Sequence, residues 1–162
     1  MQTIHLFLWR HAEAEDGVPD HARRLTAQGS RDAARVARAL AKRVRSNTRL
    51  VISPAVRARE TAEFLVAKSS LHVEIDQRLA AGSSASGVLA ALEDAVIACN
   101  GDAPLIVMVG HQPWVGQVAR RLLSDSEGDW SVKKAAAWWL VRRAREGNGE
   151  WSLRTIFDPD LL

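Results

Sequence analysis

Two arginines and two histidines in this sequence are of the types that could bind and transfer a phosphoryl group: Arg10, His11, Arg57 and His111. A guanidinium group offers planar, bidentate N–H donors that match phosphate oxygens. A neutral imidazole, whose unperturbed pKa is about 6.5, can attack phosphorus without the charge repulsion that a carboxylate would meet. If these side chains converge, we expect an oxyanion site in which a histidine nucleophile is chemically reasonable.

Each of the four side chains follows an apolar run that is typical of a buried strand. The runs are residues 3–9, 50–52 and 105–109. Ligands of open α/β sheets bind beyond the carboxyl ends of the strands, so convergence is expected there. Helices that start near Pro54 and Pro113 would add free backbone N–H groups to the same crevice.

The rest of the chain predicts helices that alternate with strands. Thr26 is expected to cap an amphipathic helix that reaches about Arg45, and Ser53 is expected to cap a helix whose first turn holds Arg57. The remaining expected elements are a weak strand at 73–75, a helix at about 86–99, a helix after residue 113 and a terminal hairpin of 136–141 with 151–156 around 147–149. This alternation predicts an α/β fold with a mostly parallel sheet and helices on both sides.

Length and composition predict a single domain over residues 1–162. With 47% apolar residues the chain can bury a core, and no apolar stretch approaches the roughly 20 residues that span a bilayer. The start of the chain lacks a signal-peptide pattern, and the single cysteine, Cys99, cannot form an internal disulfide. We therefore expect a cytoplasmic protein without a membrane partner, and the net charge of +3 gives no support for nucleic-acid binding.

Three motifs occur in the order found in one known family. They are Arg10-His11-Ala12, the stretch Ser53-Pro54-Ala55-Val56-Arg57-Ala58-Arg59-Glu60-Thr61, and Gly110-His111-Gln112-Pro113. The ordered set resembles the histidine phosphatase superfamily, whose Arg-His-Gly signature has alanine in place of glycine here. The chain length, the Leu25-Thr26-x-x-Gly29 element and the missing cap insertions make it most similar to SixA-type phosphohistidine phosphatases.

The resemblance implies a three-layer α/β/α fold, phosphoglycerate mutase-like, and a role for each of the four side chains. His11 would be the phosphorylated nucleophile, and Arg10, Arg57 and His111 would form the catalytic phosphate pocket. No metal or cofactor is implied. The implied substrate is a phosphohistidine on a phosphotransfer or phosphocarrier protein, and no nucleic acid or membrane partner is expected.

The family's usual proton donors have no clear counterpart in this sequence. Gln112 follows His111, and Arg78 stands about where SixA-type sequences carry Glu, so Asp76, Glu13 and Asp16 are the candidate acids. A phosphoramidate nitrogen can be protonated from solvent and leaves more readily than an alkoxide. The lack of a clearly placed proton donor therefore favours phosphohistidine as substrate. The lack of insertions predicts a shallow site.

Two other functions stay open at this point. A well-placed acid near Asp76 or between Glu13 and Asp16 would favour a general small-molecule phosphomonoesterase. Ala12 in place of glycine is the one feature that favours a non-catalytic module that binds a phosphorylated partner. Other residues have simpler interpretations: His5, His21 and His72 as structural or solvated, Ser53 as a helix cap, and Cys99 as a small buried residue.

Overall fold

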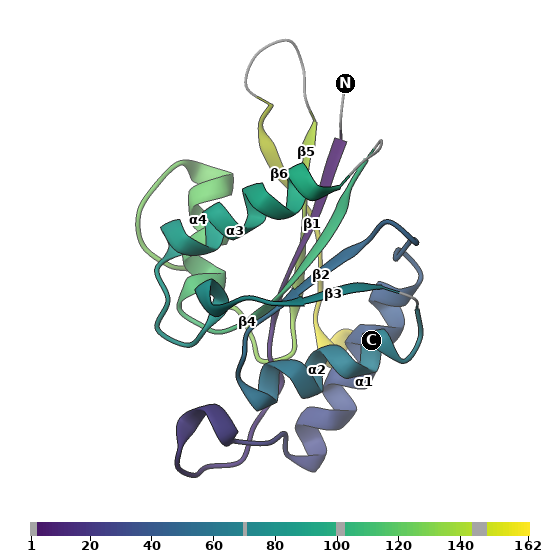
Figure 1. Cartoon of the computed structure of the whole chain (residues 1–162), viewed down its shortest axis with the longest axis vertical. Helices are drawn as coiled ribbons and strands as arrows, with labels where there is room; N and C mark the ends of the chain where they lie inside the picture. Colours follow the sequence, from purple (N-terminus) through teal and green to yellow (C-terminus); the bar gives the residue numbers. More distant parts are fainter. Residues whose placement is uncertain (1–2, 70, 100–102, 144–148) are drawn as a thin grey trace.

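The computed structural model of the chain describes residues 3–69, 71–99, 103–143 and 149–162 (Figure 1). Strands and helices alternate through most of it, as the hydrophobic pattern predicts. In chain order the elements are β1 (Thr3–Arg10), η1 (Asp20–Ala22), α1 (Ala27–Ala41), β2 (Arg49–Ile52), α2 (Val56–Val66), β3 (His72–Ile75), η2 (Gln77–Leu79), α3 (Ala85–Ala98), β4 (Leu105–Gly110), α4 (Trp114–Ser124), β5 (Ala137–Arg143), β6 (Trp151–Phe157) and η3 (Pro159–Leu161).

The strands form one sheet in the order β3-β2-β4-β1-β5-β6. Strands β1, β2, β3 and β4 pair in parallel, whereas β5 runs antiparallel to both of its neighbours. The parallel register sets Arg10 beside Gly110 and Ile52 beside Val109, so three strands end at the same edge. The residues that follow them, His11, Ser53 and His111, are thereby brought to one place.

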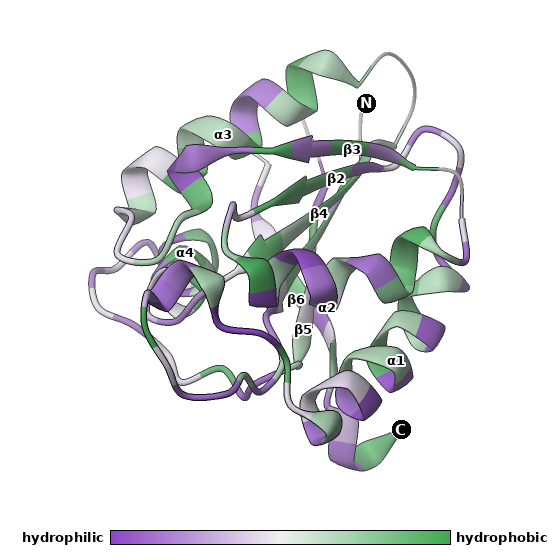
Figure 2. Cartoon of the chain, turned by 60° about the horizontal axis from the view of Figure 1, so that its bottom comes forward, coloured by the Kyte–Doolittle hydropathy of each residue, from purple (hydrophilic) through white to green (hydrophobic). Residues whose placement is uncertain are grey.

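Helices cover both faces of the sheet, which confirms the expected three-layer α/β/α class (Figure 2). Alternate residues of β1 separate into two cores: Leu6 and Leu8 pack with α3 and α4, whereas Phe7 and Trp9 pack with α1 and α2. The neighbouring pair Trp138 and Trp139 divides in the same way. This period of two is the pattern of a strand buried on both faces.

Local details differ from expectation at two helix ends. Helix α1 is capped by the Thr26 hydroxyl as predicted, but it ends at Ala41 rather than near Arg45. The chain after the helix forms a turn between Arg45 and Thr48. The Thr48 hydroxyl accepts a hydrogen bond from the Arg45 N–H at 2.9 Å, and the Thr48 N–H donates to the Arg45 carbonyl. The expected cap at Ser53 is wrong: α2 begins after Ala55, and no side chain caps it.

Other expectations have mixed outcomes. Strands β5 and β6 pair as an antiparallel hairpin, as predicted, although most of its expected turn lies outside the described residues. Cys99 is only partly buried, because it lies at the end of α3 rather than inside the core. Among the helices that the structure describes, none is long and apolar enough to cross a membrane.

Candidate active site

Three of the four side chains indicated by the sequence lie in direct contact beyond the carboxyl ends of β1, β2 and β4. The Arg57 Nε–H donates to His11 Nε2 at 3.2 Å, and Arg57 Nη2 lies 3.3 Å from His111 Nδ1. The two imidazole rings have their centroids 5.0 Å apart. Because Arg57 is only 4% exposed, solvent screens its positive charge little, and the charge acts on the side chains around it.

Arg10 completes the group from the last position of β1. Its Nη1 donates to the Val132 carbonyl at 2.7 Å, which fixes the guanidinium against the segment between α4 and β5. Its Nε is buried and has no hydrogen-bond partner among the described residues. Burial lowers the Arg10 pKa, and its charge is close enough to lower the pKa of His11 and of His111. A donor without a partner at such a place suits an anionic ligand.

The His11 ring is held in the state that a nucleophile needs. Its Nδ1 lies 2.7 Å from the Ala12 carbonyl, which can only accept, so Nδ1 carries the proton and Nε2 is unprotonated, with its lone pair directed at Arg57 Nε. Burial, followed by the charges of Arg57 and Arg10, lowers the His11 pKa to about 4 against the opposing effect of the Ala12 hydrogen bond. His11 is therefore a neutral base at neutral pH.

His111 is oriented by Ser53, whose hydroxyl lies 2.6 Å from His111 Nε2. Since the Nδ1 atom faces the Arg57 donor, the proton of this ring belongs on Nε2 and is donated to Ser53 Oγ. Burial and the neighbouring His11 and Arg57 lower the His111 pKa to about 3. Ser53 thus serves as the partner of a buried imidazole, which explains why it does not cap α2.

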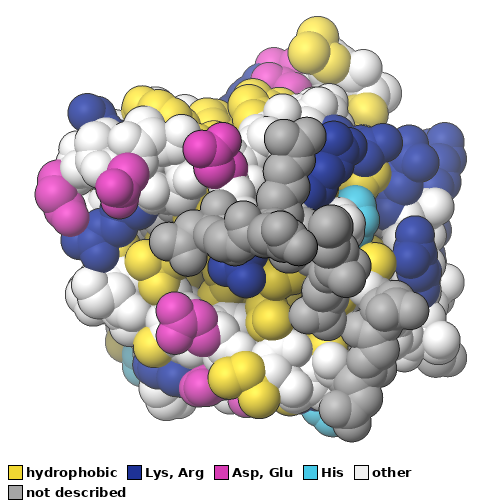
Figure 3. All heavy atoms as spheres, turned by 90° about the horizontal axis from the view of Figure 1, so that it is seen from above, with side chains coloured by type: hydrophobic (Ala, Val, Ile, Leu, Met, Phe, Trp, Pro, Cys, Tyr) yellow, Lys and Arg dark blue, Asp and Glu magenta, His cyan; other side chains and the backbone are white. Residues whose placement is uncertain are grey.

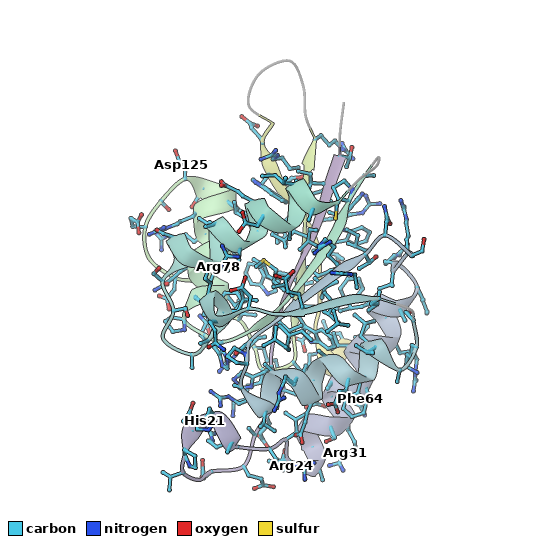
Figure 4. All side chains as sticks on the ribbon, in the orientation of Figure 1. His21, Arg24, Arg31, Phe64, Arg78 and Asp125 are labelled. Carbon is cyan, nitrogen blue, oxygen red and sulfur yellow. The ribbon has the colours of Figure 1, made fainter. Side chains whose placement is uncertain are left out.

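Asp20 is a site residue that the sequence did not indicate. It starts the short helix η1, in the segment between β1 and α1 that carries the labelled His21 and Arg24 in Figure 4. Arg57 donates from Nη1 to the Asp20 carbonyl at 2.8 Å and from Nη2 to Asp20 Oδ2 at 3.0 Å. Hydrogen bonds from Arg23 and then Arg57 lower the Asp20 pKa, so the carboxylate stays charged. The carbonyl and the carboxylate of Asp20 therefore occupy both terminal nitrogens of Arg57.

The other motif residues build the frame of the site. The Thr61 hydroxyl donates to the Arg57 carbonyl at 2.7 Å and accepts from the Ala12 N–H at 3.0 Å, which joins α2 to the end of β1. Gly29 is required because an added Cβ would collide with the Glu13 carbonyl. These contacts give physical reasons for the threonine and glycine of the motifs.

Ala12 is fully buried and packs with Ala33 and Ala135. It is not among the residues of positive φ, so its backbone does not require glycine. Its methyl group faces an apolar cluster that includes Leu25 and Phe64. The alanine at the place of the family's glycine is therefore accommodated by the core.

The three candidate acids are each engaged elsewhere. Asp76 accepts from Arg78 Nη2 at 2.6 Å, and this pairing lowers the Asp76 pKa. Glu13 accepts from the Thr26 hydroxyl, and Asp16 is fully exposed and lies 3.9 Å from an Arg23 nitrogen. None of the three has a recorded contact with His11, Arg57 or His111 among the described residues.

A hollow of about 270 Å³ adjoins the cluster and is lined in part by Asp20, Ser53 and Ala80. Both imidazoles are buried: His11 is 9% and His111 2% exposed. Asp20 lies both at this hollow and against Arg57, so the segment that carries it borders the cluster. Within the described residues no group of three metal-ligating side chains occurs.

Comparison with known proteins places this arrangement in a family. A model of the histidine phosphatase superfamily (branch 1) matches residues 6–81. An uncharacterised protein of Picosynechococcus sp. is 35% identical over 137 residues, which cover 82% of this chain and 81% of that protein.

Solved structures share the fold over almost the whole chain. A candidate phosphohistidine phosphatase SixA from Nakamurella multipartitia is 25% identical with a TM-score of 0.79, and the match covers 98% of each chain. The protein histidine phosphatase SixA complexed with tungstate is 24% identical with a TM-score of 0.78 and 99% of each chain covered. A mycobacterial glucosyl-3-phosphoglycerate phosphatase, 18% identical with a TM-score of 0.73, covers 95% of this chain and 98% of its own.

The fold, with histidines and arginines clustered at the carboxyl edge of its sheet, defines an α/β protein of the phosphatase class. The chain belongs to the histidine phosphatase superfamily and is of the SixA type.

Proposed function

We propose that this protein is a metal-independent phosphatase that removes phosphate from a phosphohistidine on a phosphotransfer or phosphocarrier protein. The observation that carries the proposal is the neutral His11 ring, whose unprotonated Nε2 accepts from the buried Arg57 beside His111. An unprotonated nucleophile with adjacent anion-binding donors is what phosphoryl transfer requires.

In the first step the phosphoryl group replaces Asp20 as the partner of Arg57. His11 Nε2 attacks phosphorus in line, an N–P bond to His11 forms, and the P–N bond of the substrate breaks. The bond's electron pair goes to the leaving imidazole nitrogen, which takes a proton from water. Arg10 and Arg57 stabilise the charge on the equatorial oxygens, and His111 joins them once the bound anion favours protonation of its Nδ1.

In the second step water attacks the phosphorus of phospho-His11. The N–P bond breaks, its electron pair returns to His11 Nε2, and inorganic phosphate leaves. The hydrogen bond from Nδ1 to the Ala12 carbonyl is present throughout, so the ring keeps its orientation between the two steps. Two guanidinium groups supply the positive charge that other phosphatases obtain from a metal.

The state of the carboxylates favours a phosphoramidate over a phosphate ester. An ester oxygen needs a protonated acid when it leaves, whereas cations lower the pKa of both Asp20 and Asp76 and keep them ionised. The likeness to proteins described as SixA phosphohistidine phosphatases supports the same substrate class. The likeness to the glucosyl-3-phosphoglycerate phosphatase makes a small phosphate ester the second candidate.

The test compares phosphate release from a phosphohistidine-bearing carrier protein with release from p-nitrophenyl phosphate. Wild type, His11→Ala and the control His72→Ala, which alters an exposed histidine of β3, are measured with and without EDTA. We expect fast release from the carrier, little from the ester, complete loss in His11→Ala and no effect of His72→Ala or EDTA. Faster ester hydrolysis would favour the second candidate, and tight binding of the carrier without turnover would favour the non-catalytic module.

A further inference from the structure

A second cavity lies at the opposite end of β1 from the nucleophile. It measures about 420 Å³ and is lined by basic and aromatic side chains: His5, Lys42, Arg43, Arg45, Trp139 and Arg154. At about 3.3 Å per residue, the step from His5 to His11 along β1 separates the two sites by roughly 20 Å. The cavity is therefore distinct from the candidate active site.

Positive charge dominates this cavity. Lys42, Arg43, Arg45 and Arg154 are exposed, and none of them forms an ion pair with a carboxylate of the described residues. Figure 3, which views the molecule from the end where β1 begins, shows Lys and Arg side chains gathered on one side of that face. Cations brought together without an anion repel one another, so an added anion stabilises the arrangement.

Two of the cationic side chains lie over the Trp139 ring. The Arg43 and Arg154 guanidinium groups lie 5.4 and 4.5 Å from the Trp139 ring centroid. The Trp139 indole N–H donates to His5 Nδ1 at 3.1 Å, which fixes the ring from its edge. Arginines that rest on a fixed ring lose less freedom when they bind an anion. The ring itself is only 7% exposed, so it has no free face on which a nucleobase could stack.

From these features we propose that this basic pocket binds a compact polyanion with two adjacent phosphate groups, of the pyrophosphate type. One phosphate group carries a charge of about −1.5 to −2 at neutral pH, so two of them match four cationic side chains. The cavity volume falls within the range of about 300–1,000 Å³ that is usual for small-ligand sites. Because recognition rests on the phosphates alone, pyrophosphate and a nucleoside diphosphate should bind with similar affinity.

The test follows the NMR signal of the Trp139 indole N–H while inorganic pyrophosphate is added at constant ionic strength. The signal is assigned with Trp139→Phe, and it reports on this pocket rather than on the active site. Arg45→Gln and Arg154→Gln should each weaken binding about tenfold or more, since each removes a charged donor. Arg31→Gln, which removes the same charge at the far end of α1 (Figure 4), should change nothing.

The active-site variant Arg57→Gln separates this proposal from the proposed function. A saturable Trp139 shift that persists in Arg57→Gln and weakens in Arg45→Gln and Arg154→Gln supports the basic pocket, whatever the catalytic result. No shift at millimolar pyrophosphate, or binding by Arg45→Gln and Arg154→Gln as tight as that of the wild type, would overturn it. Orthophosphate binding as tightly as pyrophosphate, ADP binding tenfold more tightly, or a response to oligonucleotides alone would also contradict the proposed ligand class.

Discussion

Asp20→Ala should strengthen the binding of a phosphate-like oxyanion to the active site. In the free protein the Asp20 carboxylate is hydrogen-bonded to Arg57 at 3.0 Å and to Arg23 at 3.0 Å. An oxyanion that uses Arg57 has to displace this carboxylate and then stays near its negative charge. Removing the carboxylate eliminates both costs and leaves the buried Arg57 in place.

The size of the effect follows from the exposure of the pair. The Asp20 side chain is 58% exposed, and ion pairs of this kind contribute about 0.2–1 kcal/mol. Two unit charges about 4 Å apart in water repel by about 1 kcal/mol, which adds the remaining repulsion. A total of about 1–2 kcal/mol corresponds to an affinity gain of about 5- to 30-fold.

Calorimetric titration with tungstate measures this gain. Asp16→Ala is the matched control, because Asp16 lies on the same segment and is fully exposed, with no recorded contact to Arg57. We expect tighter binding for Asp20→Ala alone. Unchanged or weaker binding would refute the view that Asp20 competes with the phosphoryl group, and would instead assign it to binding of the substrate.

Further predictions concern protonation and the frame of the site. Because the His11 pKa is lowered to about 4, the rate of phosphoenzyme formation should be flat from about pH 6 to 8 and fall only as the pH approaches 4; a midpoint near 6.5 in stopped-flow measurements would contradict this. The same shift means that the free energy of unfolding decreases as pH falls from about 6.5 to 4, since the unfolded chain binds the proton first. Thr61→Val leaves the buried Ala12 N–H without a partner and should cost about 1–3 kcal/mol in urea unfolding; a loss below the measurement error would be inconsistent with that role. Gly29→Ala should destabilise by about 1–3 kcal/mol through its collision with backbone, whereas Gly87→Ala, whose new methyl meets only ordinary contacts, should be close to neutral in the same thermal unfolding assay.

Periodicity was sufficient to predict the elements of the fold. The apolar runs that became β1, β2 and β4 differ from the amphipathic pattern of α1, and the split of Trp138 from Trp139 follows from strand geometry alone. The end of α1 was not predictable in this way. Arg43 and Val44 continue the helical pattern, and the helix stops because of a turn closed by Thr48, which is a contact between particular side-chain and backbone atoms.

The positions of the active-site residues were partly predictable, because residues that follow neighbouring parallel strands must meet. The roles of Ser53 and Asp20 were not. Ser53 in front of proline has the pattern of a cap, yet the buried His111 ring requires a hydrogen-bond partner and receives Ser53. Asp20 reaches Arg57 across 37 positions through a segment without periodicity, so no local pattern could indicate the contact.

The most direct test of the proposed mechanism is to identify the phosphorylated residue during turnover. Rapid alkaline quenching of the protein mixed with a phosphohistidine-bearing carrier, followed by peptide mass spectrometry, locates a transient phosphoryl group. We expect phosphate on His11, linked through Nε2, and none in His11→Ala. Turnover with no phosphoenzyme, or phosphate on another residue in the wild type, would contradict the assignment of His11 as the nucleophile.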